Sequence, residues 1–132
     1  MIIMKNTILS LLLALGTLTA VADTQFAEIS TADLKQAIKS RQVVLLDVNG
    51  TESWQKGHIP SALNFAAVKE ELTKKLPADK NALVVAYCGN EHCGAYRAAA
   101  LAAQNLGYKN VKHYAKGIQG WVKIGETTEK GS

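Results

Sequence analysis

The chain has 132 residues, of which 48% are hydrophobic and 20% charged, and its formal net charge at pH 7 is +4. This composition is typical of one globular domain and excludes a disordered chain, which carries fewer apolar residues and more net charge. The lysines are scattered, with Lys74-Lys75 the longest basic run, so a nucleic-acid-binding surface is not indicated. Two cysteines are too few for a disulfide-stabilised scaffold.

The beginning of the sequence has the three-part layout of a secretory signal peptide. A short start carrying Lys5 precedes the uncharged segment 6–22, whose centre is apolar. Ala20-Val21-Ala22 then supplies the small-x-small cleavage pattern, directly before Asp23. A retained membrane anchor is the alternative, but the segment is at the lower length limit for a spanning helix and contains several polar residues. We therefore expect residues 1–22 to be removed and the mature chain to be periplasmic or secreted, without membrane association.

The mature chain alternates helix and strand patterns. Ser30 with Asp33 three residues later forms a capping box, and the helix that follows is expected to end near Ser40. Continuous apolar runs of the kind that suits strands buried on both faces occur at 43–48 and 82–87, with shorter candidates at 62–65 and 111–114. Further helices are expected at 68–76, 95–106 and 119–124, the second of them closed by Gly107.

This alternation predicts an α/β fold. The expected architecture is a small doubly wound three-layer sandwich, with a mostly parallel central sheet and helices on both faces. One domain is expected over residues 23–132, with its core at about 28–124 and a flexible, unpacked tail from 125.

The residues that carry chemistry gather in the turn after the strand that ends at Tyr87. Ligands of open α/β sheets bind beyond the carboxyl ends of the strands. There Cys88 faces the N-terminus of an alanine-rich helix, whose N–H dipoles favour the reactive thiolate. The substrate-binding loop predicted around it consists of Gly89, Asn90, Glu91, His92, Cys93, Gly94 and Ala95. The alternative is an ordinary buried cysteine at the end of a strand.

Two ordered sets of motifs resemble those of the rhodanese-like (thiosulfate sulfurtransferase) domain family and together cover roughly residues 28 to 124. The first set is Val44–Val48, Trp54 and Gly57–Asn64, and the second is Val84–Cys88, Ala98–Ala100, Leu106–Val111 and Gly117–Trp121. The resemblance implies that Cys88 carries a sulfane sulfur as a persulfide. It further implies that Asp47, His58 and Asn64 are structural support, with Asp47 tying loops together by hydrogen bonds and His58 a turn residue rather than a base.

The loop departs from the common pattern of that family. It is longer, it contains no arginine, and Cys93 stands five residues after Cys88. Glu91 works against an anionic substrate unless its side chain points outward, and Arg97 lies one turn into the helix. Cys93 can form a disulfide with Cys88 if their Cα atoms lie about 4.4–6.8 Å apart, or act as a resolving thiol.

Three functions fit these residues. The first is sulfur transfer, in which the Cys88 thiolate takes sulfur from a donor such as thiosulfate or a persulfide and passes it to a thiol or cyanide. The second is thiol–disulfide chemistry that uses Cys88 with Cys93, and the third is a non-catalytic binding domain. Sulfur transfer ranks first because the wider resemblance follows a sulfurtransferase family. We expect a monomer with no metal and no cofactor, whose partners are a small sulfur-containing anion or a thiol acceptor.

Overall fold

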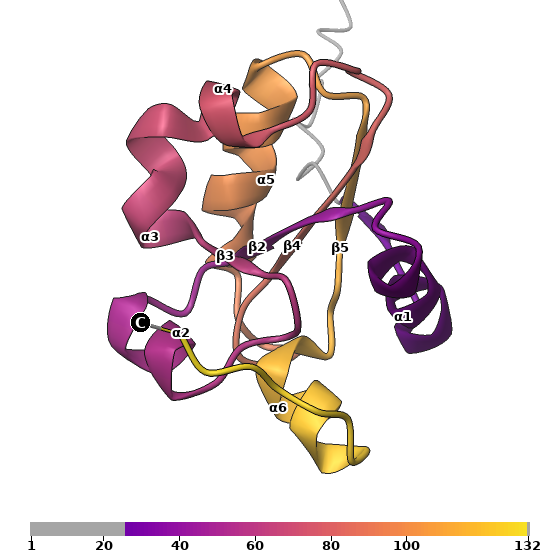
Figure 1. Cartoon of the computed structure of the whole chain (residues 1–132), viewed down its shortest axis with the longest axis vertical. Coiled ribbons are helices and arrows are strands. Elements are labelled where there is room, and N and C mark those ends of the chain that lie inside the picture. The colour runs from indigo at the N-terminus through magenta and orange to yellow at the C-terminus, as the bar shows by residue number, and fades with distance from the viewer. Residues whose placement is uncertain (1–25, 132) are drawn as a thin grey trace, which may run out of the picture.

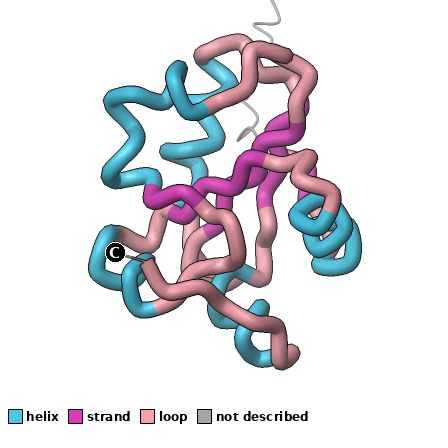
Figure 2. The backbone as a smooth tube through the Cα atoms, in the orientation of Figure 1, coloured by secondary structure: helices cyan, strands magenta, loops and turns pink. Residues whose placement is uncertain are grey.

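A parallel β-sheet runs through the centre of the computed structural model, which describes residues 26–131. The signal peptide expected at residues 1–22 lies outside the described residues. Within the described part, five strands form the sheet in the order β1-β5-β4-β2-β3, and every pair is parallel. The strands are β1 (Ala27–Glu28), β2 (Val44–Asp47), β3 (Leu63–Asn64), β4 (Leu83–Tyr87) and β5 (Asn110–His113). Figure 2 shows the strands as a central band with helices on both sides.

Helices cover both faces of this sheet (Figure 1). On one face lie α3 (Phe65–Val68), α4 (Leu72–Lys75) and α5 (Tyr96–Asn105), with the 3₁₀ turn η1 (Lys69–Glu71) between the first two. The other face carries α1 (Thr31–Lys39) and α6 (Gly117–Lys123), while α2 (Thr51–Lys56) follows β2. The predicted three-layer α/β architecture is confirmed.

Strand β4 is buried on both faces because its side chains alternate between two hydrophobic clusters. Val84 and Ala86 pack toward the alanines of α5, whereas Val85 and Tyr87 pack into the cluster that contains residues of α1 and α6. This alternation follows from the period of two along a strand. Cys88 continues it and faces the α5 side.

Several boundaries differ from the sequence-based expectation. The Ser30 cap is present, since its Oγ accepts a 3.1 Å hydrogen bond from the N–H of Asp33. The helix expected at 68–76 is wrong as a single element, because the segment 65–75 is divided into α3, η1 and α4. Strand β1 and helix α2 were not expected. In α2 no residue is buried, so it has no apolar stripe that a sequence pattern would show.

The expectation of an unpacked tail from residue 125 is wrong. Glu129 and His58 exchange two backbone hydrogen bonds of 2.9 Å, forming an antiparallel bridge. The carbonyl oxygen of Thr127 accepts a 2.7 Å hydrogen bond from Nε1 of Trp121, and the N–H of Gly131 donates to Gln55 in α2. Figure 1 accordingly shows the last described residues beside α2. In the part of the chain that the structure describes, each helix is too short or too polar to cross a membrane.

Candidate active site

Cys88 lies directly beyond the carboxyl end of β4, where the sequence predicts the nucleophile. Its side chain is 1% exposed and belongs to the hydrophobic cluster between the sheet and α5. A disulfide joins it to Cys93, with the two Cα atoms 6.3 Å apart. Cys93 itself is only half-buried, between the exposed residues His92 and Gly94. The two cysteines therefore differ sharply in their exposure to solvent.

Hydrogen bonds within the predicted substrate-binding loop occupy two of its backbone N–H groups. Oδ1 of Asn90 accepts a 2.9 Å hydrogen bond from the N–H of His92, and the carbonyl oxygen of Asn90 accepts one of 3.2 Å from the N–H of Cys93. Because the N–H groups of His92 and Cys93 already donate to Asn90, they are not available to bind an anion in this arrangement of the loop. The side chain of Glu91, which the sequence left ambiguous, is exposed.

Helix α6 fixes the beginning of the loop from the other side. The N–H groups of Ile118 and Gln119 donate to the carbonyl oxygens of Cys88 and Gly89, over 3.0 and 2.9 Å. Gly117 permits this approach, because a Cβ at this position would lie 2.5 Å from the Cys88 carbonyl oxygen and its φ is +62°. Sequence reasoning assigned Gly117 to a motif but gave it no role.

A buried hydrogen-bond network supports the site beneath Cys88. Asp47, which is 0% exposed, accepts a 2.6 Å hydrogen bond from the phenol of Tyr87 and one of 2.8 Å from the N–H of Asn49. The Tyr87 oxygen in turn accepts from the N–H of Ile59. Burial, followed by the neighbouring Asp47 carboxylate, raises the pKa of Tyr87 far above its usual range, so the phenol remains a donor. Asp47 thus joins β2, β4 and the turn at Ile59.

His58 and Asn64 have their partners away from the cysteine loop. The His58 ring stacks on Trp54 with centroids 4.2 Å apart, and its Nδ1 lies 2.8 Å from the Trp54 carbonyl oxygen. Nε2 of His58 lies 3.8 Å from the carboxylate of Glu129. Asn64 donates from Nδ2 to the hydroxyl of Thr51 over 2.9 Å. The structure therefore does not bring these two residues together with Cys88.

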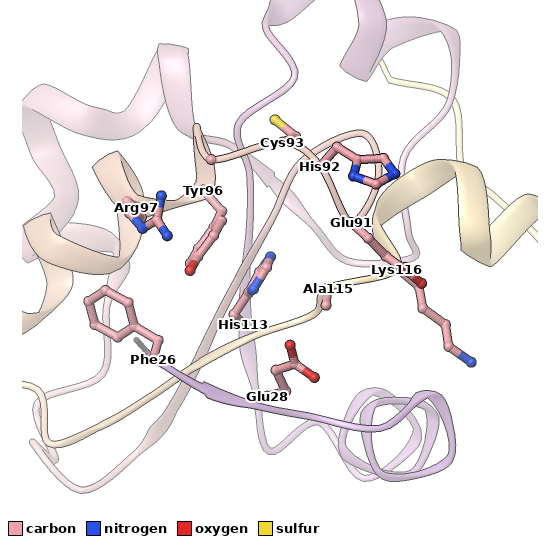
Figure 3. Close-up of a pocket in the computed structure, with 11 residues that line it drawn as sticks. Phe26, Glu28, Glu91, His92, Cys93, Tyr96, Arg97, His113, Ala115 and Lys116 are labelled. Atoms are coloured by element: carbon pink, nitrogen blue, oxygen red, sulfur yellow. The ribbon is translucent and has the colours of Figure 1, made fainter. Parts of the chain in front are cut away.

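A pocket of about 480 Å³ lies beside the loop, between the start of α5 and the ends of β1 and β5. Figure 3 shows Cys93 and His92 at one rim, Arg97 and Lys116 on opposite sides, and His113 near the middle. Sequence reasoning did not find this pocket, since its residues come from three separate segments of the chain. Among residues 26–131 no group of His, Cys, Asp and Glu side chains is arranged to hold a metal ion.

His113 is the buried ionisable group of this pocket. It is 6% exposed and stacks on Tyr96, with ring centroids 3.3 Å apart. Burial lowers the pKa of His113; Glu28 acts in the opposite direction, and Arg97 lowers it further. The lowered pKa favours the neutral imidazole at neutral pH.

Comparison with known proteins decides the family. Residues 30–124 match the rhodanese-like domain. The chain belongs to the rhodanese-like domain family. It is 30% identical over 97 residues to the thiosulfate sulfurtransferase GlpE of Coxiella burnetii, covering 73% of this chain and 87% of that protein. These relationships support a sulfurtransferase of the rhodanese-like family.

Two further similarities are to longer proteins, each of which matches this chain over about half of its own length. An HTH-type transcriptional regulator of Mycobacterium tuberculosis is 31% identical over 106 residues, which cover 79% of this chain and 45% of the regulator. The chain thus spans less than half of that relative's length. The solved structure of the 3-mercaptopyruvate sulfotransferase SseA of Escherichia coli matches with a TM-score of 0.65 at 15% identity, over 82% of this chain and 52% of that protein. This last similarity shows that the rhodanese-like fold is shared.

Proposed function

We propose that the protein transfers sulfane sulfur through a persulfide on Cys88. The observation that carries this proposal is the position of Cys88 at the carboxyl end of the central strand β4, at the start of a loop held by α6, in a chain of the rhodanese-like family. Ligand-binding residues of open α/β sheets lie at this end of the strands.

The reaction has two displacement steps. The Cys88 thiolate attacks the outer sulfur of thiosulfate, the S–S bond of the donor breaks, and sulfite leaves with the bonding electrons. A thiolate or cyanide acceptor then attacks the outer sulfur of the persulfide and releases the Cys88 thiolate. The small sulfur-containing anion and the acceptor are the two substrates.

The disulfide is a resting form that must be reduced before this cycle begins. In it Cys88 is covered, and its sulfur lies 3.2 Å from the carbonyl oxygen of Cys93. A substrate must reach the sulfur that attacks it, and Cys88 is 1% exposed, so the loop has to move for Cys88 to react. Cys93 can also close the cycle without an acceptor. Its thiolate attacks Sγ of the Cys88 persulfide, hydrosulfide leaves, and the disulfide re-forms.

Thiol–disulfide chemistry is the second candidate, and the Cys88–Cys93 disulfide is the observation that favours it. The two functions differ in what Cys93 does. In sulfur transfer Cys93 is at most a resolving thiol, whereas in redox chemistry the pair is the active unit.

Thiocyanate formation from thiosulfate and cyanide separates these functions. The protein is reduced, freed of reductant and assayed as wild type, Cys88→Ser and Cys93→Ser. We expect turnover in wild type and in Cys93→Ser, and none in Cys88→Ser. Mass spectrometry after thiosulfate alone should find one added sulfur atom on the Cys88 peptide, longer-lived in Cys93→Ser because no internal thiol removes it. Activity in Cys88→Ser would exclude the mechanism, and loss of activity in Cys93→Ser with a mixed disulfide on Cys88 would favour redox chemistry.

We also propose that the protein acts outside the cytoplasm, on the basis of the signal-peptide pattern at residues 1–22. N-terminal sequencing of the protein from its native host should give a chain that begins at or near Asp23. Recovery of an intact Met1 in the membrane fraction would contradict this proposal.

A further inference from the structure

The disulfide presents only one of its two cysteines to solvent. Cys88 is 1% exposed within a hydrophobic cluster, whereas Cys93 is half-buried and borders the pocket beside the loop. Thiol–disulfide exchange requires the attacking thiolate to reach the sulfur that it attacks. A thiol arriving from solvent therefore meets Cys93 first, and the sulfur that it displaces is that of Cys88.

The pocket next to Cys93 carries charges of both signs. Arg97 and Lys116 lie on opposite sides of it, and the carboxylates of Glu28 and Glu91 belong to the same lining (Figure 3). The two positive and two negative side chains balance, so a purely anionic ligand meets repulsion from the carboxylates as well as attraction from Arg97 and Lys116. A ligand that carries both a carboxylate and an ammonium group finds an opposite charge for each.

An unpartnered buried atom points to a polar ligand in the same pocket. Nε2 of His113 finds no hydrogen-bond partner among residues 26–131, although the side chain is 6% exposed and lines the pocket. A buried polar atom without a partner is costly. Because the imidazole is neutral, its Nε2–H tautomer can donate to the carboxylate of a bound ligand. In Figure 3 the His113 ring lies between Arg97 and Glu28, while Cys93 lies at the edge of the pocket with its sulfur directed away from the His113 ring.

We propose that a small amino-acid thiol binds in this pocket and opens the Cys88–Cys93 disulfide by attacking Cys93. The ligand's thiolate bonds to Sγ of Cys93, the bond between the two protein sulfurs breaks, and Cys88 leaves as the thiolate. A second thiolate then attacks the ligand's sulfur in the mixed disulfide and releases Cys93. Two thiols are oxidised to one disulfide, and the protein disulfide is reduced. The inference rests on the protein disulfide and not on the persulfide step, so either proposal can fail alone.

L-cysteine is the probe for the site of attack. The oxidised protein is mixed with L-cysteine, quenched with acid at early times and alkylated, then cleaved after Glu91 so that Cys88 and Cys93 fall in different peptides. We expect the cysteinyl adduct on Cys93 and the alkyl group on Cys88. An adduct on Cys88, or equal adducts on both residues, would overturn the proposal. Thiocyanate formation by the pre-reduced protein is measured separately and reports only on sulfur transfer.

The contribution of the pocket is measured by comparing L-cysteine with cysteamine, which lacks the carboxylate. Rates of disulfide opening are normalised to the thiolate concentration of each reagent. We expect wild type to favour L-cysteine by about fivefold, the effect of one partly buried ion pair. Arg97→Gln and Lys116→Gln should each reduce this preference, whereas Lys109→Gln, at the opposite end of β5, should leave it unchanged. Equal rates for the two thiols in wild type, or the same preference in all variants, would overturn the assignment of the pocket.

Discussion

The phenol of Tyr87 donates a 2.6 Å hydrogen bond to Oδ2 of Asp47, and both side chains are fully buried. Tyr87 is the last residue of β4, and Asp47 is the last residue of β2. The bond therefore joins the central strand β4 to its neighbour β2 at the residue directly before Cys88. The phenol oxygen of Tyr87 also accepts a hydrogen bond from the N–H of Ile59, which brings the turn after α2 into the same network. The starting point of the cysteine loop is thus determined by a polar contact inside the hydrophobic core.

Replacing Tyr87 by Phe should destabilise the protein by about 2–3 kcal/mol. The substitution leaves the buried Asp47 carboxylate without its strongest donor and the N–H of Ile59 without an acceptor. Tyr108→Phe is the matched control, because the Tyr108 phenol donates to the carbonyl oxygen of Pro77, a single bond to a neutral acceptor. Urea unfolding of both variants measures the difference. Equal losses would show that the Asp47 network contributes no more than an ordinary hydrogen bond.

Replacing Gly117 by Ala should disturb the loop as well as the stability. The new Cβ would lie 2.5 Å from the Cys88 carbonyl oxygen, and a side chain at φ +62° is strained. We expect a loss of about 2–5 kcal/mol, and a fall in thiocyanate formation of about tenfold or more because the nucleophile is displaced. Gly125→Ala is the control: its φ is +85°, but nothing lies within 4 Å of the added Cβ. It should cost about 1 kcal/mol without loss of activity. Unchanged activity in Gly117→Ala would mean that α6 does not position Cys88.

The pocket histidine should make stability depend on pH. The pKa of His113 is lowered from its ordinary value of 6.5, mainly by burial, so the unfolded chain binds the proton more readily than the folded one. Above pH 6.5 His113 is neutral in both the folded and the unfolded chain, and its contribution to the free energy of unfolding is fully present. As the pH falls below 6.5 and through the folded pKa, the unfolded chain takes up the proton first and this contribution is lost. His113→Gln should reduce the slope of stability against pH between about 7 and 5, where one proton accounts for at most about 1.4 kcal/mol per pH unit.

Urea unfolding of wild type and His113→Gln at several pH values tests this. The two groups that act on the His113 charge, Glu28 and Arg97, stay in place in both proteins. Subtraction of the two curves removes the contribution of every other titrating group that the substitution leaves unchanged. Parallel curves would contradict the prediction.

The fold could be predicted where one segment carries its own signal. The apolar runs at 43–48 and 82–87 contain β2 and β4, because strands buried on both faces need continuous hydrophobic sequence. The Ser30 cap marked the start of α1. Strand β1 is two residues long, and its pairing with β5 depends on the order of strands in the sheet. No local sequence pattern predicts a strand of this length.

The candidate site divides in the same way. Cys88 and its loop were found because a strand, a cysteine, glycines and a helix follow one another directly in the sequence. The roles of Gly117 and His113 could not be predicted, because they depend on contacts between distant segments. Gly117 matters because α6 packs against the cysteine loop, and His113 because it stacks on Tyr96. Burial of Cys88 was raised as an alternative but could not be decided from the sequence, since it depends on the packing of the cluster that also contains Tyr96 and the alanines of α5.

The contact between α6 and the cysteine loop sets a limit on protein engineering. A randomised library confined to codons 89–95 would vary every side chain of the loop. It would still leave the carbonyl oxygens of Cys88 and Gly89 bound to the N–H groups of Ile118 and Gln119. Such a library samples new surfaces on one unchanged backbone anchor. A change of substrate preference that requires a different path of the chain at Gly89 therefore calls for simultaneous diversification of residues 117–119.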